Sequence, residues 1–86
     1  MGTNLAEIER LVSGELVGGS PDKEIQDISE IQNASPDEIA FLSNPKYFKY
    51  LDTTEAAAVV LPEDYSGGFT PRIVVKQPMM AVRTLI

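Results

Sequence analysis

Apolar residues near the start of the chain recur at the spacing of one helix face. The four are Leu5, Ile8, Leu11 and Val12. Because acidic and basic residues fill most of the positions between them, the pattern predicts an amphipathic helix with one buried face. Thr3 or Asn4 offers a capping side chain before this helix, and Gly14 is expected to end it.

The chain after this helix predicts two short strands. Residues 15–18 and residues 25–28 are rich in Leu, Val and Ile, and the segment 18–22 between them has the Gly, Ser, Pro and Asp composition of a turn. We therefore predict that the two strands pair with each other as a hairpin. Asp27 and Glu30 lie around the next turn and are predicted to face solvent.

Three later segments predict buried strands. Residues 39–43 are apolar on both faces, as in a sheet that is covered on both sides. Residues 56–61 are continuously apolar and stop at Pro62, and residues 72–76 follow a polar loop. Residues 35–38 form a turn, or a single helical turn, before the first of these strands.

Two helices are predicted in the second half of the chain. Asn44 is a suitable N-cap and Pro45 stands at the favoured first position, so a helix is expected from there to about Leu51. A last helix is expected to open at residues 77–78. Its apolar side consists of Met79, Met80, Val82 and Leu85.

These elements predict an α/β fold with a small mixed sheet of about five strands and flanking helices. A chain of 86 residues suffices for one small domain. Since it stops at Leu85 and Ile86, within an apolar helix face, we expect residues 1–86 to be a fragment of a longer protein. The alternative is a short protein whose last helix packs on its own core.

Composition excludes several function classes. With 13 acidic and 7 basic residues the net charge is -6, so the basic surface of a nucleic-acid binder is missing. The chain has no cysteine and no histidine, which removes thiolate chemistry and the commonest general base and metal ligand. No metal ion or cofactor is predicted. Without a membrane-length apolar run or a secretion signal, we expect a cytoplasmic protein.

One group of side chains indicates a ligand. Phe41 and Tyr47 place two aromatic rings on either side of Asn44, and a flat heteroaromatic ring could stack between them. The Asn44 amide offers both a donor and an acceptor to the edge of such a ring. The group lies at the carboxyl end of a strand and the amino end of a helix, where open α/β sheets bind their ligands.

Each of these residues also has a purely structural explanation. Phe41 could be a core aromatic, Asn44 a helix cap, and Tyr47 a ring lying on the sheet with its hydroxyl in water. It is their convergence that favours a site. Lys46 and Lys49 beside them could attract phosphate, although a solvated helix face explains both equally.

Catalytic groups are not predicted. Asp37 and Glu38 are adjacent carboxylates, but turn formation explains them without chemistry. The serines at positions 13, 35 and 43 have no histidine to activate them. The residues alone therefore indicate a binding module.

The chain resembles a known family. The resemblance is carried by residues 39–47, Ile-Ala-Phe-Leu-Ser-Asn-Pro-Lys-Tyr, and by Leu51 and the Ala-Ala-Ala-Val-Val of residues 56–60. Together with residues 14–19 and 74–78 in the same order, they closely resemble the N-terminal domain of the UDP-3-O-acylglucosamine N-acyltransferases, the LpxD family. The Asn-Pro-Lys-Tyr tetrapeptide is its most specific part.

The resemblance implies a role in lipid A biosynthesis of Gram-negative bacteria. Enzymes of this family transfer a 3-hydroxyacyl group from acyl carrier protein to the amine of a UDP-activated, 3-O-acylated glucosamine. It implies that residues 1–86 form the N-terminal uridine-binding domain, with the uracil held between Phe41 and Tyr47 and its edge bonded to Asn44. The catalytic histidine and the homotrimer interface belong to a following left-handed β-helix, so we expect this fragment to be monomeric and without catalytic residues.

Two other interpretations stay open from the sequence. The domain could be a structural or docking unit without a small ligand, with Phe41 and Tyr47 in its core. It could also be the uridine-nucleotide domain of another cell-envelope enzyme, such as a Mur ligase, although no Mur-type motif is present.

Overall fold

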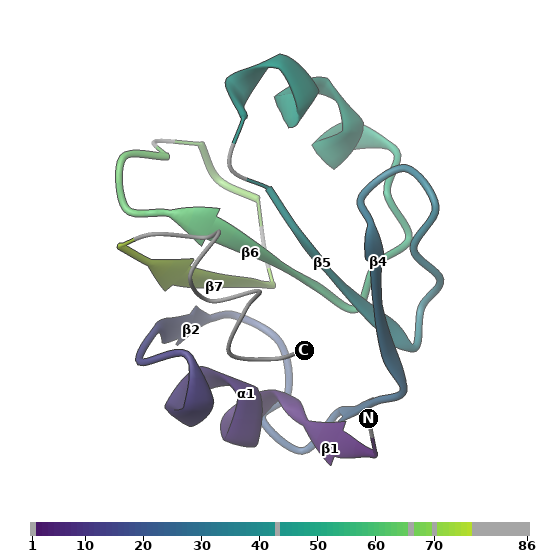
Figure 1. Cartoon of the computed structure of the whole chain (residues 1–86), viewed down its shortest axis with the longest axis vertical. Coiled ribbons are helices and arrows are strands. Elements are labelled where there is room, and N and C mark those ends of the chain that lie inside the picture. The colour runs from purple at the N-terminus through teal and green to yellow at the C-terminus, as the bar shows by residue number, and fades with distance from the viewer. Residues whose placement is uncertain (1, 43, 66, 70, 77–86) are drawn as a thin grey trace.

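A five-stranded sheet lies at the centre of the computed structural model, which describes residues 2–42, 44–65, 67–69 and 71–76 (Figure 1). A second sheet of two strands lies beside it. In chain order the elements are β1 (Thr3–Asn4), α1 (Leu5–Leu11), β2 (Glu15–Val17), β3 (Glu24–Ile25), β4 (Asp27–Glu30), β5 (Glu38–Phe41), η1 (Pro45–Asp52), β6 (Ala58–Pro62) and β7 (Arg72–Val75).

The main sheet is mixed, with strand order β2-β7-β6-β5-β4. Strands β4, β5, β6 and β7 run parallel to one another, and β2 pairs antiparallel with β7 at the edge. The small sheet is the antiparallel pair of β1 and β3. The predicted α/β class, with a small mixed sheet of five strands and flanking helices, is confirmed.

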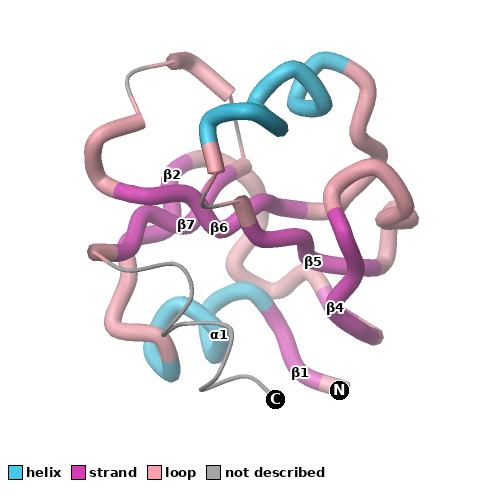
Figure 2. Tube along the Cα trace, turned by 45° about the horizontal axis from the view of Figure 1, so that its top comes forward, coloured by secondary structure: helices cyan, strands magenta, loops and turns pink. Residues whose placement is uncertain are grey.

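Alternation along the strands divides the core between the two faces of the sheet. On β5, Ile39 packs with Leu5 and Ile8 of α1, whereas the next residue, Ala40, packs with Leu51 of η1. Successive side chains of a strand point to opposite faces, so a strand that is covered on both faces must be apolar throughout. Figure 2 shows the sheet as a middle layer between α1 and η1.

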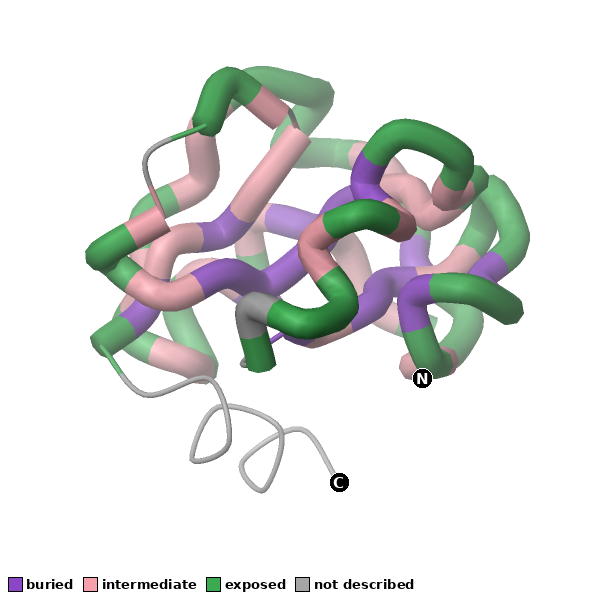
Figure 3. The backbone as a smooth tube through the Cα atoms, turned by 90° about the horizontal axis from the view of Figure 1, so that it is seen from above, coloured by how far each residue is buried: buried purple, intermediate pink, exposed green. Residues whose placement is uncertain are grey.

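The central strand β6 is the most buried element. Its residues Ala58 to Leu61 are each at most 1% exposed. In Figure 3 buried positions follow the strands through the middle of the molecule, and exposed positions gather in the connections. The run of small and β-branched residues that predicted this strand is therefore explained by a position between two parallel neighbours.

Both helices within the described residues have the caps that the sequence predicts. Asn4 accepts a hydrogen bond from the backbone N–H of Glu7 at 2.8 Å, and Asn44 caps η1 in the same way. The segment Pro45–Asp52 is a 3-10 helix. The helix predicted from residues 77–78 onward lies outside the described residues.

The predicted hairpin between residues 15–18 and 25–28 is wrong. Strand β2 pairs with β7, and the second segment divides into β3, which pairs with β1, and β4, which pairs with β5. The physical reason lies at the start of α1, whose first N–H groups have no partner within the helix. Leu5 and Ala6 donate to the carbonyls of Lys23 and Pro21 at 3.1 and 3.0 Å, which draws the chain away from β2.

Candidate functional site

The parallel strands bring two connections together at one edge of the sheet. The chain leaves β4 at Glu30 and β5 at Phe41, and these two residues are direct partners in the register. Beyond Phe41, the backbone N–H of Leu42 still donates to the carbonyl of Val60 at 2.9 Å. The start of η1 and the turn that follows β4 therefore lie together at the carboxyl ends of β4 and β5. Ligands of open α/β sheets bind at this edge.

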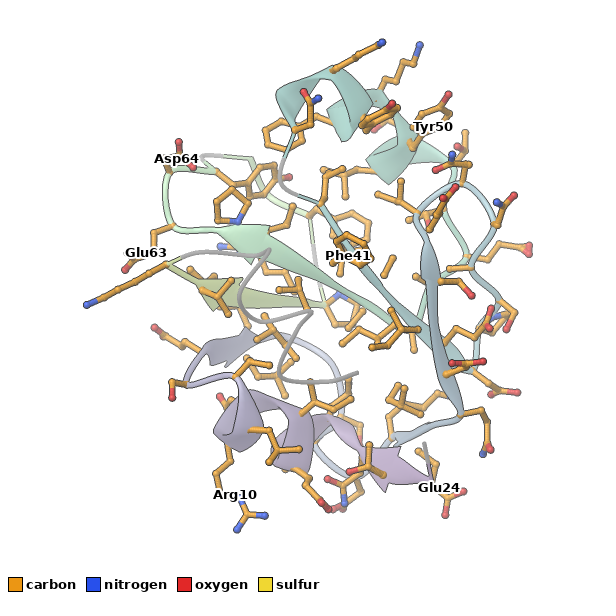
Figure 4. The ribbon with its side chains drawn as sticks, viewed as in Figure 1. Arg10, Glu24, Phe41, Tyr50, Glu63 and Asp64 are labelled. Atoms are coloured by element: carbon orange, nitrogen blue, oxygen red, sulfur yellow. The ribbon has the colours of Figure 1, made fainter. Side chains whose placement is uncertain are left out.

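A hollow of about 220 Å³ opens between these segments. All three site residues predicted from the sequence, Phe41, Asn44 and Tyr47, contribute to its wall. Figure 4 shows Phe41 near the end of β5 below η1, which carries Tyr50, and Glu24 at the opposite end of the molecule. The complete lining is Glu30, Ile31, Gln32, Phe41, Leu42, Asn44 and Tyr47.

Phe41 is anchored in the core. It lies between Glu30 of β4 and Val60 of β6 in the sheet register, and it packs as a half-buried side chain against the cluster on the α1 face. Its structural role, predicted as the alternative to a ligand contact, is therefore present together with its position in the hollow. Packing against this cluster restricts the Phe41 side chain, which lowers the entropy cost of any contact that it makes with a ligand.

Tyr47 is the exposed wall of the hollow, with 37% of its surface accessible. Its ring stacks on Tyr50 with centroids 6.1 Å apart and planes inclined by 22°. The ammonium group of Lys46 lies 5.8 Å from the Tyr47 ring centroid, and that of Lys49 lies 5.4 Å from the Tyr50 centroid. Stacking and cation–π contacts at these distances orient the ring without burying it.

Asn44 stands between the two aromatic residues in the sequence and lines the hollow with them. Its Oδ1 accepts the backbone N–H of Lys46 at 3.0 Å, so the predicted cap is present. An amide oxygen has a second lone pair and the amide nitrogen has two protons, and the described residues provide no hydrogen-bond partner for those protons. Asn44 thus retains both a donor and an acceptor for a ligand.

The sequence missed a third side of the hollow. Glu30, Ile31 and Gln32 line it from the end of β4, and Gln32 Nε2 donates to Glu30 Oε2 at 3.2 Å. Glu30 is exposed as predicted, yet its place beside Phe41 depends on the parallel pairing of β4 and β5. The incorrect hairpin placed β4 against β2. Without the correct strand order, the sequence could not show that Glu30 lies beside Phe41.

The carboxylates predicted to be structural have structural partners. Asp37 accepts from Lys23 Nζ at 3.1 Å, and Glu38 accepts from the Ser35 backbone N–H and the Ser29 hydroxyl, each at 2.8 Å. The Ser35 N–H, followed by the Ser29 hydroxyl, lowers the pKa of Glu38, and partial burial opposes them. These groups stabilise the connection between β4 and β5.

Two features are absent from the described part of the chain. No group of three or more Asp, Glu, His or Cys side chains there could hold a metal ion. None of the helices in that part is long and apolar enough to cross a membrane.

Comparison with known proteins decides the family. The sequence model of UDP-3-O-(3-hydroxymyristoyl) glucosamine N-acyltransferase, LpxD, matches residues 22–86. The chain belongs to the LpxD family. The resemblance inferred from residues 39–47 is thereby confirmed, and the interpretation as another cell-envelope enzyme loses its support.

Individual LpxD relatives give the same result. A UDP-3-O-acylglucosamine N-acyltransferase of Rickettsia conorii is 45% identical over 65 residues, which cover 72% of this chain and 19% of the relative. One of Cellvibrio japonicus is 39% identical over 79 residues, or 91% of this chain and 23% of the relative. The chain thus spans about a fifth of the length of these curated relatives.

Proposed function

We propose that this chain is the uridine-recognition domain of an N-acyltransferase of lipid A biosynthesis. The parent enzyme would transfer a 3-hydroxyacyl group from acyl carrier protein to the amine of UDP-3-O-acylglucosamine. The relatives carry the name of that acyltransferase, which supports the acceptor. The observation that best supports uridine recognition is that Phe41, Asn44 and Tyr47 line the same hollow.

The size of the hollow supports a small part of the acceptor. Drug-sized ligands occupy pockets of about 300–1,000 Å³, and this hollow measures about 220 Å³. It suits a nucleobase with part of its ribose better than a whole acylated UDP-sugar. The net charge of -6 also disfavours a diphosphate site within the domain. The base and part of its ribose therefore belong in the hollow, and the phosphates and the acylated glucosamine extend beyond it.

The chemistry of the lining suits uracil. Two aromatic side chains offer stacking surfaces, and stacking on one aromatic is worth about 1–3 kcal/mol per base. The edge of uracil presents carbonyl acceptors beside one N–H donor, which match the donor and acceptor of the Asn44 amide. Because association costs at least about 4 kcal/mol in lost freedom, one base sandwich gives only weak binding to the isolated chain.

Acyl transfer itself is assigned to the rest of the parent protein. The 86 residues contain no histidine, so the commonest general base must come from elsewhere. We expect the chain alone to give background turnover with acyl carrier protein and the UDP-sugar, and to be monomeric. Turnover by the purified 86-residue chain would show that this division of labour is wrong.

Nuclear magnetic resonance titration of the chain with UMP and CMP tests the proposal. We expect UMP to shift backbone amide signals around residues 30–32 and 41–47, and CMP to shift them much less, because cytosine exchanges the N3 donor and the O4 acceptor of uracil. Shifts confined to other regions would contradict a uracil site in the hollow. The absence of any response to UMP would favour the structural or docking interpretation.

A further inference from the structure

The polar wall of the hollow suggests a second contact to the nucleotide. Glu30 and Gln32 form it, and the 3.2 Å hydrogen bond from Gln32 Nε2 holds one oxygen of the Glu30 carboxylate in place. A carboxylate only accepts hydrogen bonds, and its two oxygens offer about four lone-pair sites. The Gln32 bond leaves most of these sites for a ligand, and the ligand must supply donors.

The donors of a uridine nucleotide are few. The base has one N–H donor at its hydrogen-bonding edge, and the Asn44 amide already supplies an acceptor for it. The phosphate oxygens are anionic acceptors that a carboxylate repels. The two ribose hydroxyls are the donors that remain, and a carboxylate can accept from both members of a vicinal diol.

Register places the carboxylate beside the base site. Glu30 is the direct partner of Phe41 in the parallel ladder, so it stands next to the ring proposed to stack on uracil. Asn44 approaches the same hollow from η1, on the other connection. A base between the aromatic side chains, with its edge at Asn44, has its ribose within reach of a neighbouring wall, and Glu30 is the acidic residue of that lining.

We infer that Glu30, positioned by Gln32, binds the ribose hydroxyls and makes the site selective for ribonucleotides over 2′-deoxyribonucleotides. This inference rests on the proposed uridine function and extends it from the base to the sugar. A site built to bond a hydroxyl discriminates against the analogue that lacks it, because a polar group of the protein then loses its partner.

The test compares the affinities of UMP and dUMP for the chain and for two variants. The original chain should bind UMP about tenfold more tightly than dUMP, the scale of one hydrogen bond to a charged group. In Glu30→Gln the ratio should fall to about threefold or less, because the amide is a weaker acceptor than the carboxylate. The ratio is informative because any change in charge repulsion with the phosphate affects both nucleotides equally.

Glu24→Gln is the matched control. Glu24 is exposed on β3, at the far end of the molecule from the hollow, and it should leave the UMP/dUMP ratio unchanged (Figure 4). Equal binding of UMP and dUMP, or an unaltered ratio in Glu30→Gln with a native spectrum, would overturn the ribose contact while the uridine function stands. Failure of both nucleotides to bind would overturn the uridine function, and the ribose contact with it.

Discussion

Asn44 Oδ1 accepts the backbone N–H of Lys46 at 3.0 Å, and this bond gives one side chain two roles. It satisfies an N–H group in the first turn of η1, which has no carbonyl partner inside the helix. It also fixes the plane of the amide at the wall of the hollow. The capping role and the proposed ligand contact can be separated by choosing substitutions that remove one of them at a time.

Asn44→Asp should keep the cap and lose the base contact. The carboxylate still accepts from the Lys46 N–H, so the free energy of unfolding should change by less than about 0.5 kcal/mol. It cannot donate, so binding of the neutral nucleoside uridine should weaken markedly. Asn44→Ala should lose both the helix cap and the contact to the base, and its free energy of unfolding should fall by about 1 kcal/mol.

Urea unfolding and uridine titration of the two variants check this separation. Using the nucleoside avoids repulsion between the new carboxylate and a phosphate. If Asn44→Asp bound uridine as tightly as the original chain, the amide would have no part in recognising the base.

Tyr47→Ala should weaken UMP binding by about 1–3 kcal/mol, the value of one stacking partner. The fold should survive, because the ring is 37% exposed. Tyr47→Phe is the matched control, since it keeps the ring and removes only the hydroxyl. In titrations, the original chain and Tyr47→Phe should bind UMP with similar affinity, and both should bind it much more tightly than Tyr47→Ala. Equal affinity of all three would exclude a stacking role for Tyr47.

Glu38 should make stability depend on pH. Its folded-state pKa is lowered by the Ser35 N–H and the Ser29 hydroxyl, so the folded protein binds fewer protons than the unfolded chain in the acidic range. The stabilisation is fully present above the ordinary pKa of 4.5 and is lost as the pH falls through the lower folded-state value. Glu38→Gln should therefore be less stable than the original chain at pH 7, with the difference shrinking toward pH 3.

Denaturant titrations at several pH values measure that difference. Glu55→Gln serves as the control, because Glu55 is exposed and a substitution at the surface usually changes stability by no more than about 0.5 kcal/mol. A constant difference between Glu38→Gln and the original chain from pH 7 to pH 3 would show that the Glu38 charge contributes nothing.

Gly14→Ala should destabilise the fold by about 1–3 kcal/mol, the usual cost of overpacking. A Cβ at Gly14 would lie 2.7 Å from Ile73 Cγ2 and 2.8 Å from the Val74 carbonyl oxygen, and a backbone atom in a sheet cannot move aside. For a domain of this size each kcal/mol corresponds to about 4–8 °C in the melting temperature. Calorimetry should therefore show a clear loss.

Gly68→Ala is the counterpart in open space. No atom of the described residues lies within 4 Å of a Cβ at Gly68, so the melting temperature of this variant should stay close to that of the original chain. If Gly14→Ala had the same melting temperature as Gly68→Ala, the close approach of residue 14 to β7 would not matter for stability.

The local elements of this fold were predictable and the strand order was not. The spacing of Leu5 and Ile8 and the Asn44-Pro45 pair act within a few residues, so the sequence reveals α1 and η1 directly. The residues of β2 pair with residues of β7 that are at least fifty-five positions away, and no local pattern encodes this pairing. The bonds from Leu5 and Ala6 to residues 21–23, which decide against the hairpin, are also non-local.

The same limit applies to the site. Phe41, Asn44 and Tyr47 lie within seven consecutive positions, so their convergence could be predicted from one strand–helix junction. Glu30 and Gln32 join the hollow only because β4 pairs parallel with β5. A side chain that reaches a site through strand pairing can be recognised only when the pairing is known.

The most direct test of the central claim is the nuclear Overhauser effect between UMP and the chain. The H5 and H6 protons of uracil should show contacts to the ring protons of both Phe41 and Tyr47, because the base is proposed to lie between them. Contacts from the uracil protons to neither ring, or to residues outside the hollow alone, would contradict a uridine site at this edge of the sheet.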